Sequence, residues 1–366
     1  MNIYFAGSIV GDPKFKTNQQ LIVNALEKLG HVVVSKQHAF QIGSEVGNEK
    51  GMTPERIFER DLWWLMRKSE VVIAELSMVS YGLGFEMGVA SVMGLPILGL
   101  VSKQVEKMSA FVKGNEFSGY KWREYDEDDL GKIIKDWFDD LDVFAKKRRG
   151  VYVAFEGLNQ CGKGTQVKML VERLMLGRYS VWQGREPGTT YIGEELRKLL
   201  QIQTEEVPMI RAEVAMLMAQ RAQLVEKEVK DHLLLDEVVV SDRSDGTSLA
   251  FQGFGRKQGI LRMAALNGYA VDQVHPDAVI YLQVPSKVVK VRGKKMEEHD
   301  RFEHEDDNFE ELCRQGYEEA IRLDEAAPPK TWFAVDAVGA PEEVHARVWE
   351  VVKPYLDQVN KRRENA

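Results

Sequence analysis

The stretch FEGLNQCGKGTQ, in the second half of the chain, has the form of a phosphate-binding loop. Gly157 is followed after four residues by Gly162 and Lys163, behind a strand-like run and at the start of a helical one. Glycines let backbone N–H groups wrap a phosphate, and a lysine ammonium adds positive charge at the helix N-terminus. The usual motif has Ser or Thr directly after the lysine, and the hydroxyl of that residue binds Mg²⁺. This chain has Gly164 there and Thr165 one place later. The residues expected to contact phosphate groups are Gly157, Asn159, Gln160, Cys161, Gly162, Lys163, Gly164 and Thr165.

Two carboxylates in the first half of the chain lie among apolar residues. Glu86 stands in SYGLGFEMGVA, behind a Gly-x-Gly turn, and Asp61 shares a predicted helix face with Ile57 and Leu65. A carboxylate is rarely buried without a partner or a task, because desolvation disfavours its ionised form. Alone, each is typical of a solvated or core-edge charge. Together with Tyr4 they indicate paired carboxylates near an anionic substrate, as glycosidic cleavage uses.

Two turns of small residues could offer backbone N–H groups to such an anion. AGSIVG follows the first predicted strand, and a second turn contains Ser80, Gly82 and Gly84. Gly88 falls one position late for a G-x-G-x-x-G dinucleotide fingerprint, and no acidic ribose partner follows in the right place. We therefore expect a phosphate at a helix N-terminus rather than a nicotinamide cofactor.

Short β-rich runs alternate with longer helical patterns in both halves, which is typical of parallel sheets with crossover helices. A length of 366 residues exceeds the usual size of one domain. A basic run, KKRR, separates an acidic amphipathic helix from a new buried strand. We predict an α/β fold of two fused domains, residues 1–145 and 151–366, with a linker at 146–150. The predicted strands are NIYFAG, HVVVS, VVIAEL and PILGLV, then VYVAFEG, YSVWQG, VVVSD, AVIYLQV and TWFAVDA.

Composition excludes several classes of protein. Hydrophobic residues make up 44% and charged residues 29%, as in ordinary globular proteins. No run approaches the roughly 18 apolar residues of a membrane span, and the N-terminus shows no basic leader. The two cysteines predict no disulfide framework. A net charge of −8 argues against nucleic-acid binding. We expect a cytoplasmic protein without nucleic-acid or membrane partners.

Five motifs of the second half resemble thymidylate kinases in order and approximate spacing. They are FEG before the loop, REPGTTYIGEELRKLL, RAEVAMLMAQRAQ, SDRSDGTSLAFQGFGR and DRFEHEDDNFEELCRQGY. The resemblance implies a P-loop nucleoside monophosphate kinase domain that uses ATP and Mg²⁺ to convert dTMP to dTDP. It implies that Arg185 and Arg243 hold the acceptor phosphate, that Arg221 meets the base edge and that Gln252 lies in the thymidylate pocket. Phosphoryl transfer demands mostly such positive charge and positioning.

The same resemblance extends to a lid and a metal site, and it has two departures. Arg292, with Arg301 after it, would belong to the lid over ATP. Besides Thr165, Asp242 is a metal candidate, because a carboxylate at the end of VVVSD can orient the water shell of Mg²⁺. Asn159 replaces the usual acidic residue against the sugar 3′-hydroxyl, and Leu217 replaces the aromatic ring that stacks on thymine, a loss of roughly 0.5–1.5 kcal/mol. A kinase for a modified deoxynucleotide is therefore an alternative.

The first half resembles the 2′-deoxynucleoside 5′-monophosphate N-glycosidases of the nucleoside 2-deoxyribosyltransferase superfamily. IYFAGSI, RDLWWL, VVIAEL and SYGLGFEMGVA carry this resemblance, which implies a Rossmann-like domain. It makes Glu86 the nucleophile at the sugar C1′, Asp61 the acid/base and Tyr4 a hydrogen-bonding neighbour. The residues that would cradle the 5′-phosphate are Gly7, Ser8, Ile9, Gly11, Ser80 and Gly82.

Two further implications concern charge and assembly. Ser109 would reach the phosphate bound by a partner subunit, which implies a homodimer through this half. The family often has an arginine where Val10 stands, so part of the positive charge around the phosphate is missing or is supplied elsewhere.

The fusion suggests a hypothesis for the whole chain. The first half, without a cofactor, would hydrolyse 5-hydroxymethyl-dUMP to free base and 2-deoxyribose 5-phosphate before a kinase could phosphorylate it. A site built to bond the extra hydroxyl can reject the methyl compound strongly. The alternatives for the first half are a base-exchanging transferase and a non-catalytic nucleotide sensor or dimerisation module.

Overall fold

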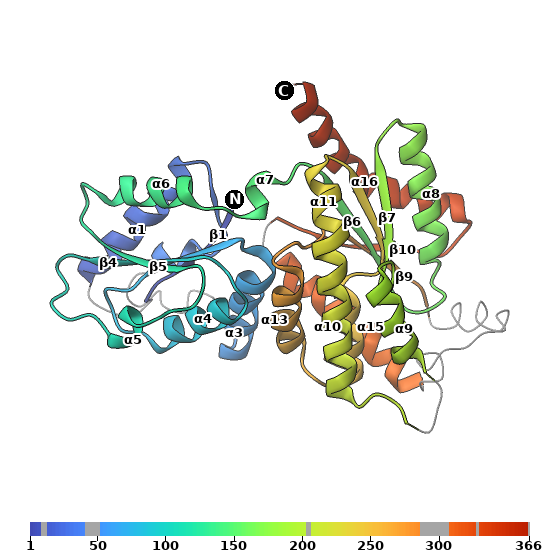
Figure 1. The fold of residues 1–366 in the computed structure, drawn as a ribbon, viewed down its shortest axis with the longest axis horizontal. Coiled ribbons are helices and arrows are strands. Elements are labelled where there is room, and N and C mark those ends of the chain that lie inside the picture. Colours follow the sequence, from blue (N-terminus) through green and yellow to red (C-terminus); the bar gives the residue numbers. More distant parts are fainter. Residues whose placement is uncertain (9–12, 41–51, 203–205, 286–306, 327–328, 365–366) are drawn as a thin grey trace. The chain divides into compact units, whose positions relative to one another are not determined.

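The computed structural model divides the chain into two compact units (Figure 1). The first comprises Met1–Lys146 with Ala326–Pro329, and the second comprises Lys147–Glu325 with Lys330–Ala366. The division after Lys146 falls within the predicted linker. The structure describes residues 1–8, 13–40, 52–202, 206–285, 307–326 and 329–364.

A parallel sheet of five strands forms the centre of the first unit. Its strand order is β2-β1-β3-β4-β5, so the direction of winding changes between β1 and β3. In open parallel sheets, ligands bind outside the carboxyl ends of the strands at such a switch point. The strands are β1 Asn2–Ala6, β2 Val32–Val33, β3 Val71–Glu75, β4 Ile97–Ser102 and β5 Tyr120–Tyr125.

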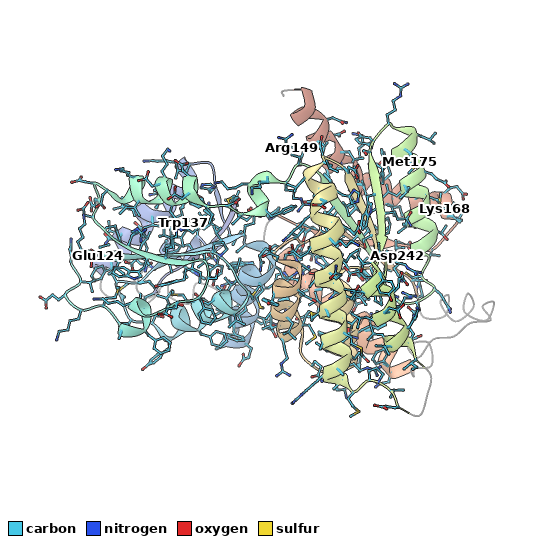
Figure 2. The ribbon with its side chains drawn as sticks, viewed as in Figure 1. Glu124, Trp137, Arg149, Lys168, Met175 and Asp242 are labelled. Carbon is cyan, nitrogen blue, oxygen red and sulfur yellow. The ribbon has the colours of Figure 1, made fainter. Side chains whose placement is uncertain are left out.

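Helices cover both faces of this sheet (Figure 1). On one face, Ile22 of α1 and Trp137 of α6 pack with Phe5 and Ile73 of the strands in one apolar core (Figure 2). On the other face, α4 and a π-helical turn, Trp64–Lys68, contact the strands. The helices are α1 Pro13–Lys28, α2 Gln37–Phe40, α3 Pro54–Trp63, α4 Tyr81–Val92, α5 Ala110–Lys113, α6 Leu130–Asp140 and α7 Phe144–Lys147.

The second unit has its own five-stranded parallel sheet, in the order β10-β9-β6-β8-β7. Its first strand, β6, is central and completely buried, as expected for a parallel sheet covered on both faces. The loop that follows β6 therefore opens at the middle of the carboxyl edge. The strands are β6 Val151–Glu156, β7 Val181–Arg185, β8 Val238–Asp242, β9 Ala278–Gln283 and β10 Trp332–Asp336.

α8 and α16 pack on one face of this sheet, where Leu170 and Val348 join the strand residues Val153 and Val240 in the core. α10 continues through a π-helical turn, Val225–Val229, into α11, and α12 continues through another, Leu249–Gly255. The helices are α8 Lys163–Leu176, α9 Tyr191–Gln201, α10 Ile210–Leu224, α11 Lys230–Leu234, α12 Asp245–Ser248, α13 Ile260–Val271, α15 Asp307–Glu325 and α16 Pro341–Glu364.

The predicted α/β architecture and all nine predicted strands are confirmed. The sequence prediction missed β5, a strand with three charged residues, most of whose positions are exposed or only partly buried before the buried Tyr125 at its end. It also placed the start of α4 too late: the helix begins at Tyr81, capped by Ser80, so that Gly82 and Gly84 lie in its first turn. Within the described ranges, none of the helices has the length and apolarity that crossing a membrane requires.

Glu75, the last residue of β3, is completely buried. One of its carboxylate oxygens accepts hydrogen bonds from the Ser77 amide and hydroxyl and from the Tyr125 hydroxyl, while the other has no partner among the described residues. Burial raises the pKa of Glu75 to about 7, against the opposing effect of these hydrogen bonds. The native state of the first unit therefore favours the protonated carboxyl up to neutral pH.

We predict that Glu75→Gln flattens the pH dependence of stability. Because the folded pKa exceeds the unfolded one, the native state binds more protons, and stability falls as pH rises from about 4.5 to about 7. At pH 8 the variant should be more stable than wild type by roughly 1–3 kcal/mol, and at pH 5 it should have no advantage. Denaturant unfolding across this pH range measures the effect. Glu124→Gln, at an exposed position of β5, is the control (Figure 2); parallel pH profiles of Glu75→Gln and wild type would contradict the prediction.

Candidate active sites

The loop between β6 and α8 has the backbone geometry that its glycines predict. Gly157 has a φ of +142°, and a Cβ there would lie 2.8 Å from the Cys161 Sγ and 3.0 Å from the Leu282 carbonyl oxygen. Gly162, the N-cap of α8, has a φ of +105°. Both positions require glycine, because side chains disfavour this region of φ and one of them has no room for a Cβ. The loop therefore presents its backbone at the N-terminus of a 14-residue helix.

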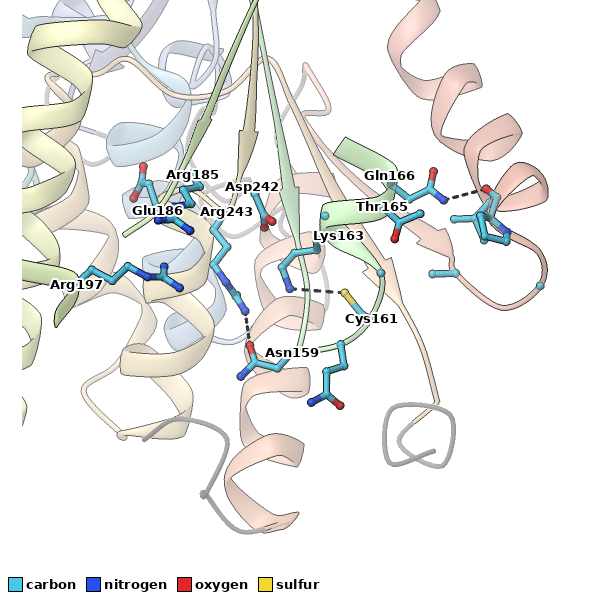
Figure 3. Close-up of a pocket in the computed structure, with 17 residues that line it drawn as sticks. Asn159, Cys161, Lys163, Thr165, Gln166, Arg185, Glu186, Arg197, Asp242 and Arg243 are labelled. Carbon is cyan, nitrogen blue, oxygen red and sulfur yellow. Dashed lines mark hydrogen bonds between the residues drawn. The ribbon is translucent and has the colours of Figure 1, made fainter. Parts of the chain in front are cut away.

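This loop borders a cavity of about 690 Å³ (Figure 3). The Lys163 ammonium is buried and donates to the carbonyl oxygens of Gly157, at 3.1 Å, and Leu158, at 2.9 Å. Burial, and then the charge of Arg243, lower the pKa of Lys163. The predicted residues that line the cavity are Asn159, Gln160, Cys161, Gly162, Lys163, Gly164, Thr165, Arg185, Asp242 and Arg243.

Three arginines line the same cavity: Arg185, Arg243 and Arg197. Arg243 donates to the Asn159 carboxamide oxygen, and Arg197 extends toward it from α9 (Figure 3). Arg185 donates to both carboxylate oxygens of Glu194. The sequence analysis missed Arg197, although it lies inside the quoted REPGTTYIGEELRKLL motif; its place on the inward face of α9 was the available signal.

Glu156, at the end of β6, organises the loop that carries Arg243. Its carboxylate accepts hydrogen bonds from the amide and hydroxyl of Ser244, at 2.9 Å each, and from the amide and hydroxyl of Thr247, at 2.9 and 2.7 Å. The Tyr317 hydroxyl donates a fifth bond at 3.0 Å. Burial raises the pKa of Glu156 despite these donors. The carboxylate thus fixes the residues directly after Arg243.

A smaller cavity of about 200 Å³ shares four lining residues with the first. Leu217, Phe251 and Gln252 line it, and the residues common to both cavities are Asn159, Glu186, Arg197 and Arg243. Phe251 supplies an aromatic ring to the pocket that the sequence analysis did not identify. The Gln252 amide donates to Glu213 at 2.7 Å, which orients the side chain.

Arg221, predicted at the base edge, is buried behind this pocket and is absent from its lining. Its guanidinium donates to Glu186 at 2.7 Å. Three more bonds go to the Ser248 hydroxyl, the Asn267 carboxamide oxygen and the Ser244 carbonyl oxygen. These four contacts indicate that Arg221 supports the pocket wall, and contact with the base stays a prediction.

In the first unit, the predicted nucleophile and its neighbour lie together at the switch point of the sheet. The Tyr4 hydroxyl, from β1, donates to the Glu86 carboxylate, from α4, at 2.8 Å. Burial raises the pKa of the Glu86 carboxyl, and burial with the charge of Glu86 raises the pKa of Tyr4 well above its usual value. Tyr4 therefore remains a neutral hydrogen-bond donor to the carboxylate.

Asp61 lies beside this pair, with two partners that the sequence analysis missed. Arg60 donates to one Asp61 oxygen through two nitrogens, at 2.7 and 2.9 Å. The His38 Nε2 lies 3.4 Å from the other oxygen. Burial lowers the pKa of His38, but Asp61 and the more distant charge of Glu86 outweigh burial, and the pKa is raised. His38 belongs to no quoted motif, whereas Arg60 is the first residue of the quoted RDLWWL, and its adjacency to Asp61 was the available signal.

The predicted phosphate-binding residues are only partly described. Gly7 is half-buried and Ser8 is buried after the end of β1, whereas Ile9 and Gly11 lie outside the described residues. Arg292 and Arg301 of the predicted lid also lie outside them. The remaining predicted residues lie near the start of α4 or α5: Ser80, Gly82 and Ser109.

Ser80 and Ser109 line one groove of about 600 Å³. Ser80 caps α4 and Ser109 caps α5. Much of the remaining lining is apolar, and Val79 and Phe111 on this groove are 94% and 92% exposed. The groove therefore combines two helix-capping hydroxyls with an uncovered apolar surface.

Comparison with known proteins separates the two halves of the chain. A family model described as thymidylate kinase matches residues 155–348. The thymidylate kinase of Fervidobacterium nodosum is 37% identical over 206 residues, which is 56% of this chain and 100% of that protein. The chain belongs to the thymidylate kinase family. Thymidylate kinases of Thermoanaerobacter sp. strain X514 and Thermosipho africanus are each 33% identical, over 57% and 56% of this chain and 100% and 99% of their own lengths.

A second family model, nucleoside 2-deoxyribosyltransferase, matches residues 3–136. The match contains Tyr4, Asp61 and Glu86, and also His38 and Arg60. The chain thus has a thymidylate kinase domain and a deoxyribosyltransferase-family domain, as both resemblances indicated.

Glu156→Gln should disrupt the thymidylate kinase domain through its Arg243 loop. A glutamine amide would turn hydrogens toward the donor groups of Ser244 and Thr247, so we expect a loss of about 1–3 kcal/mol of stability and a roughly 10- to 100-fold fall in thymidylate kinase kcat/KM. Thermal unfolding and steady-state kinetics measure the two effects. Glu172→Gln, on the exposed face of α8, is the matched control. Wild-type kinetics in Glu156→Gln would refute this positioning role.

Proposed function

We propose that the chain is a bifunctional deoxynucleotide enzyme. The second unit transfers a phosphoryl group from ATP to dTMP, and the first unit hydrolyses the N-glycosidic bond of a deoxynucleoside 5′-monophosphate, with 5-hydroxymethyl-dUMP as the preferred substrate. The kinase activity is supported by the family membership and by the cation-lined cavity. The hydrolase activity is supported most directly by the 2.8 Å hydrogen bond between Tyr4 and Glu86 beside Asp61.

In the kinase unit, the phosphates of ATP lie on the loop before α8, and Lys163 leaves its carbonyl partners to bind them. Arg185, Arg197 and Arg243 bind the acceptor phosphate from the opposite wall and hold it in line for attack. Asp242 and Thr165 present hard oxygen ligands to the same cavity and so fit Mg²⁺. When bound, the ion neutralises charge on the transferring phosphates.

In the base pocket, Gln252 and the ring of Phe251 provide part of the contact to the base that the aliphatic Leu217 does not provide. The Phe251 ring lies 5.4 Å from the guanidinium carbon of Arg243 and on the lining of the pocket. An aromatic surface at this place offers contact to a pyrimidine ring. This observation favours dTMP over a strongly altered base as the kinase substrate.

In the hydrolase unit, the Glu86 carboxylate attacks the sugar C1′ while the bond from C1′ to the base nitrogen breaks. Tyr4 orients the attacking oxygen. Asp61 accepts two hydrogen bonds from Arg60 on one oxygen and has the His38 imidazole 3.4 Å from the other; with His38 as its neighbour, Asp61 acts as the acid/base that delivers the proton to the departing base. Water then attacks C1′ and gives its proton to the acid/base, which had lost one to the base, while the bond from C1′ to Glu86 breaks to give 2-deoxyribose 5-phosphate and the Glu86 carboxylate.

We predict that Glu86→Gln abolishes base release and leaves phosphorylation intact. The amide cannot form the glycosyl ester, so release of base should fall by roughly 10³-fold or more. Lys163→Ala should do the reverse, since it removes a cation from the kinase cavity alone. A panel of deoxynucleoside monophosphates, with and without ATP and Mg²⁺, reports free base and diphosphate separately. Base release by Glu86→Gln at the wild-type rate would exclude this nucleophile.

The same panel distinguishes the proposed hydrolase from its alternatives. Transfer of deoxyribose to an added free base, in place of water, would identify a transferase. A wild-type protein that binds nucleotides without releasing base would be a sensor. Equal consumption of dTMP and 5-hydroxymethyl-dUMP would rule out selective removal of the modified nucleotide.

The apolar groove beside Ser109 supports a homodimer through the first unit. Tyr81 and Phe111 are 98% and 92% exposed, and large uncovered apolar surfaces mark interaction sites. In a two-fold dimer each groove faces its own copy, which carries Ser109 to the phosphate bound by the partner subunit.

Mixing two inactive variants tests this arrangement. Glu86→Gln and Ser109→Ala should each release base poorly, but co-expressed chains form mixed dimers in which one site keeps both residues. About a quarter of wild-type base release should return. Size-exclusion chromatography with light scattering measures assembly in parallel. A mixture no more active than the average of the two variants would show that Ser109 does not act across subunits.

A further inference from the structure

Lys16, on α1, is a buried cation without an anionic partner. Its side chain is in a residue only 8% exposed, and its ammonium donates to the Gln19 carboxamide oxygen at 3.1 Å and the His38 carbonyl oxygen at 2.5 Å. Both acceptors are neutral. Among the residues that the structure describes, no carboxylate pairs with Lys16. A buried ammonium is costly unless it is paired, and burial lowers the pKa of this one.

The ammonium lies next to the turn that follows β1. Gln19, which accepts from Lys16, donates through its Nε2 to the Ser8 carbonyl oxygen at 2.9 Å. The same nitrogen lies 3.0 Å from the position that a Cβ on Gly7 would occupy. Helix side chains lean toward the helix N-terminus, so the Lys16 side chain leans toward the end of α1 that adjoins this turn.

We propose that Lys16 supplies the positive charge that binds the 5′-phosphate in the hydrolase unit. This inference rests on the proposed glycosidase function and adds a residue to its site. An ammonium has three donors, and two of them have acceptors among the described residues. The third is left for a phosphate oxygen, which would also provide the missing negative charge. Val10, where the resembling family often has arginine, leaves this role open.

The contact of Lys16 with the His38 backbone allows a different role, in which Lys16 only positions His38. The two roles predict different kinetics. A phosphate ligand matters only for substrates with a phosphate, whereas a residue that positions His38 matters equally for the nucleoside and its monophosphate.

The test compares wild type, Lys16→Met and Lys16→Arg in the full chain. Base release is measured from 5-hydroxymethyl-dUMP and from 5-hydroxymethyl-deoxyuridine. We expect Lys16→Met to raise KM for the monophosphate by about 10- to 100-fold with a smaller change in kcat, and to leave the slow nucleoside reaction unchanged. Lys16→Arg should retain part of the preference for the monophosphate. Lys28→Met, on the exposed end of α1, is the control, and thermal unfolding of the full chain reports whether the first unit is folded.

Inhibition measurements distinguish the phosphate of a sugar from inorganic phosphate as the ligand of Lys16. Lys16→Met should weaken inhibition by 2-deoxyribose 5-phosphate, and inorganic phosphate should inhibit wild type more weakly than the sugar phosphate does. Equal losses of kcat with nucleoside and monophosphate would overturn the proposal in favour of positioning, as would an unchanged ratio of kcat/KM for the two substrates.

A binding measurement keeps the proposal independent of catalysis. In a Glu86→Gln background, calorimetric titration with 2-deoxyribose 5-phosphate should give a Kd that rises at least about tenfold on adding Lys16→Met. If wild type releases no base but this difference remains, the glycosidase function fails and the phosphate site stands. If base is released but Kd is unaffected by Lys16→Met, the phosphate site fails and the glycosidase function stands.

Discussion

Five hydrogen bonds converge on the buried carboxylate of Glu156, and the geometry of the kinase cavity depends on them. An ionised group at the end of a central strand is costly unless donors replace its water. The backbone amides of Ser244 and Thr247 supply that replacement, and in doing so they fix the segment that presents Arg243. The hydrogen bonds that replace water around the Glu156 carboxylate therefore also position the Arg243 guanidinium, which has the opposite charge.

Buried carboxyl groups of the first unit also depend on hydrogen-bond donors, but they have fewer of them than Glu156. Within the described part of the chain, Glu75 has three donors on one oxygen and none on the other, and its native environment favours the neutral acid. Glu86 accepts a hydrogen bond from the Tyr4 hydroxyl and is partly exposed. Its carboxylate is therefore accessible to a substrate. Two carboxyl groups on or near the carboxyl edge of one sheet therefore differ in role because they differ in their hydrogen-bond donors.

Much of this could be predicted from the sequence where the signal is contiguous. The loop from Gly157 to Thr165 has its glycines, its lysine and its strand–helix context within a few residues. The buried strands could be predicted from their apolar, β-branched composition. Residues that act through distant partners gave weaker signals. Tyr4 and Glu86 are 82 positions apart, and only a resemblance linked them. His38 and Lys16 had no signal, because a lone histidine or lysine in a polar helix is usually a surface residue, and their burial results from tertiary packing.

The two units use positive charge in amounts that suit their substrates. Three arginines and Lys163 line a cavity that must hold the phosphates of two nucleotides, where catalysis consists largely of stabilising negative charge. In the proposed glycosidase the nucleophile is itself an anion, and its direct hydrogen-bond partner is the neutral Tyr4 hydroxyl. Lys16 contacts Gln19 and the His38 backbone, while Glu86 contacts Tyr4. In the proposed reaction, Lys16 would therefore serve the phosphate while Tyr4 serves the nucleophile.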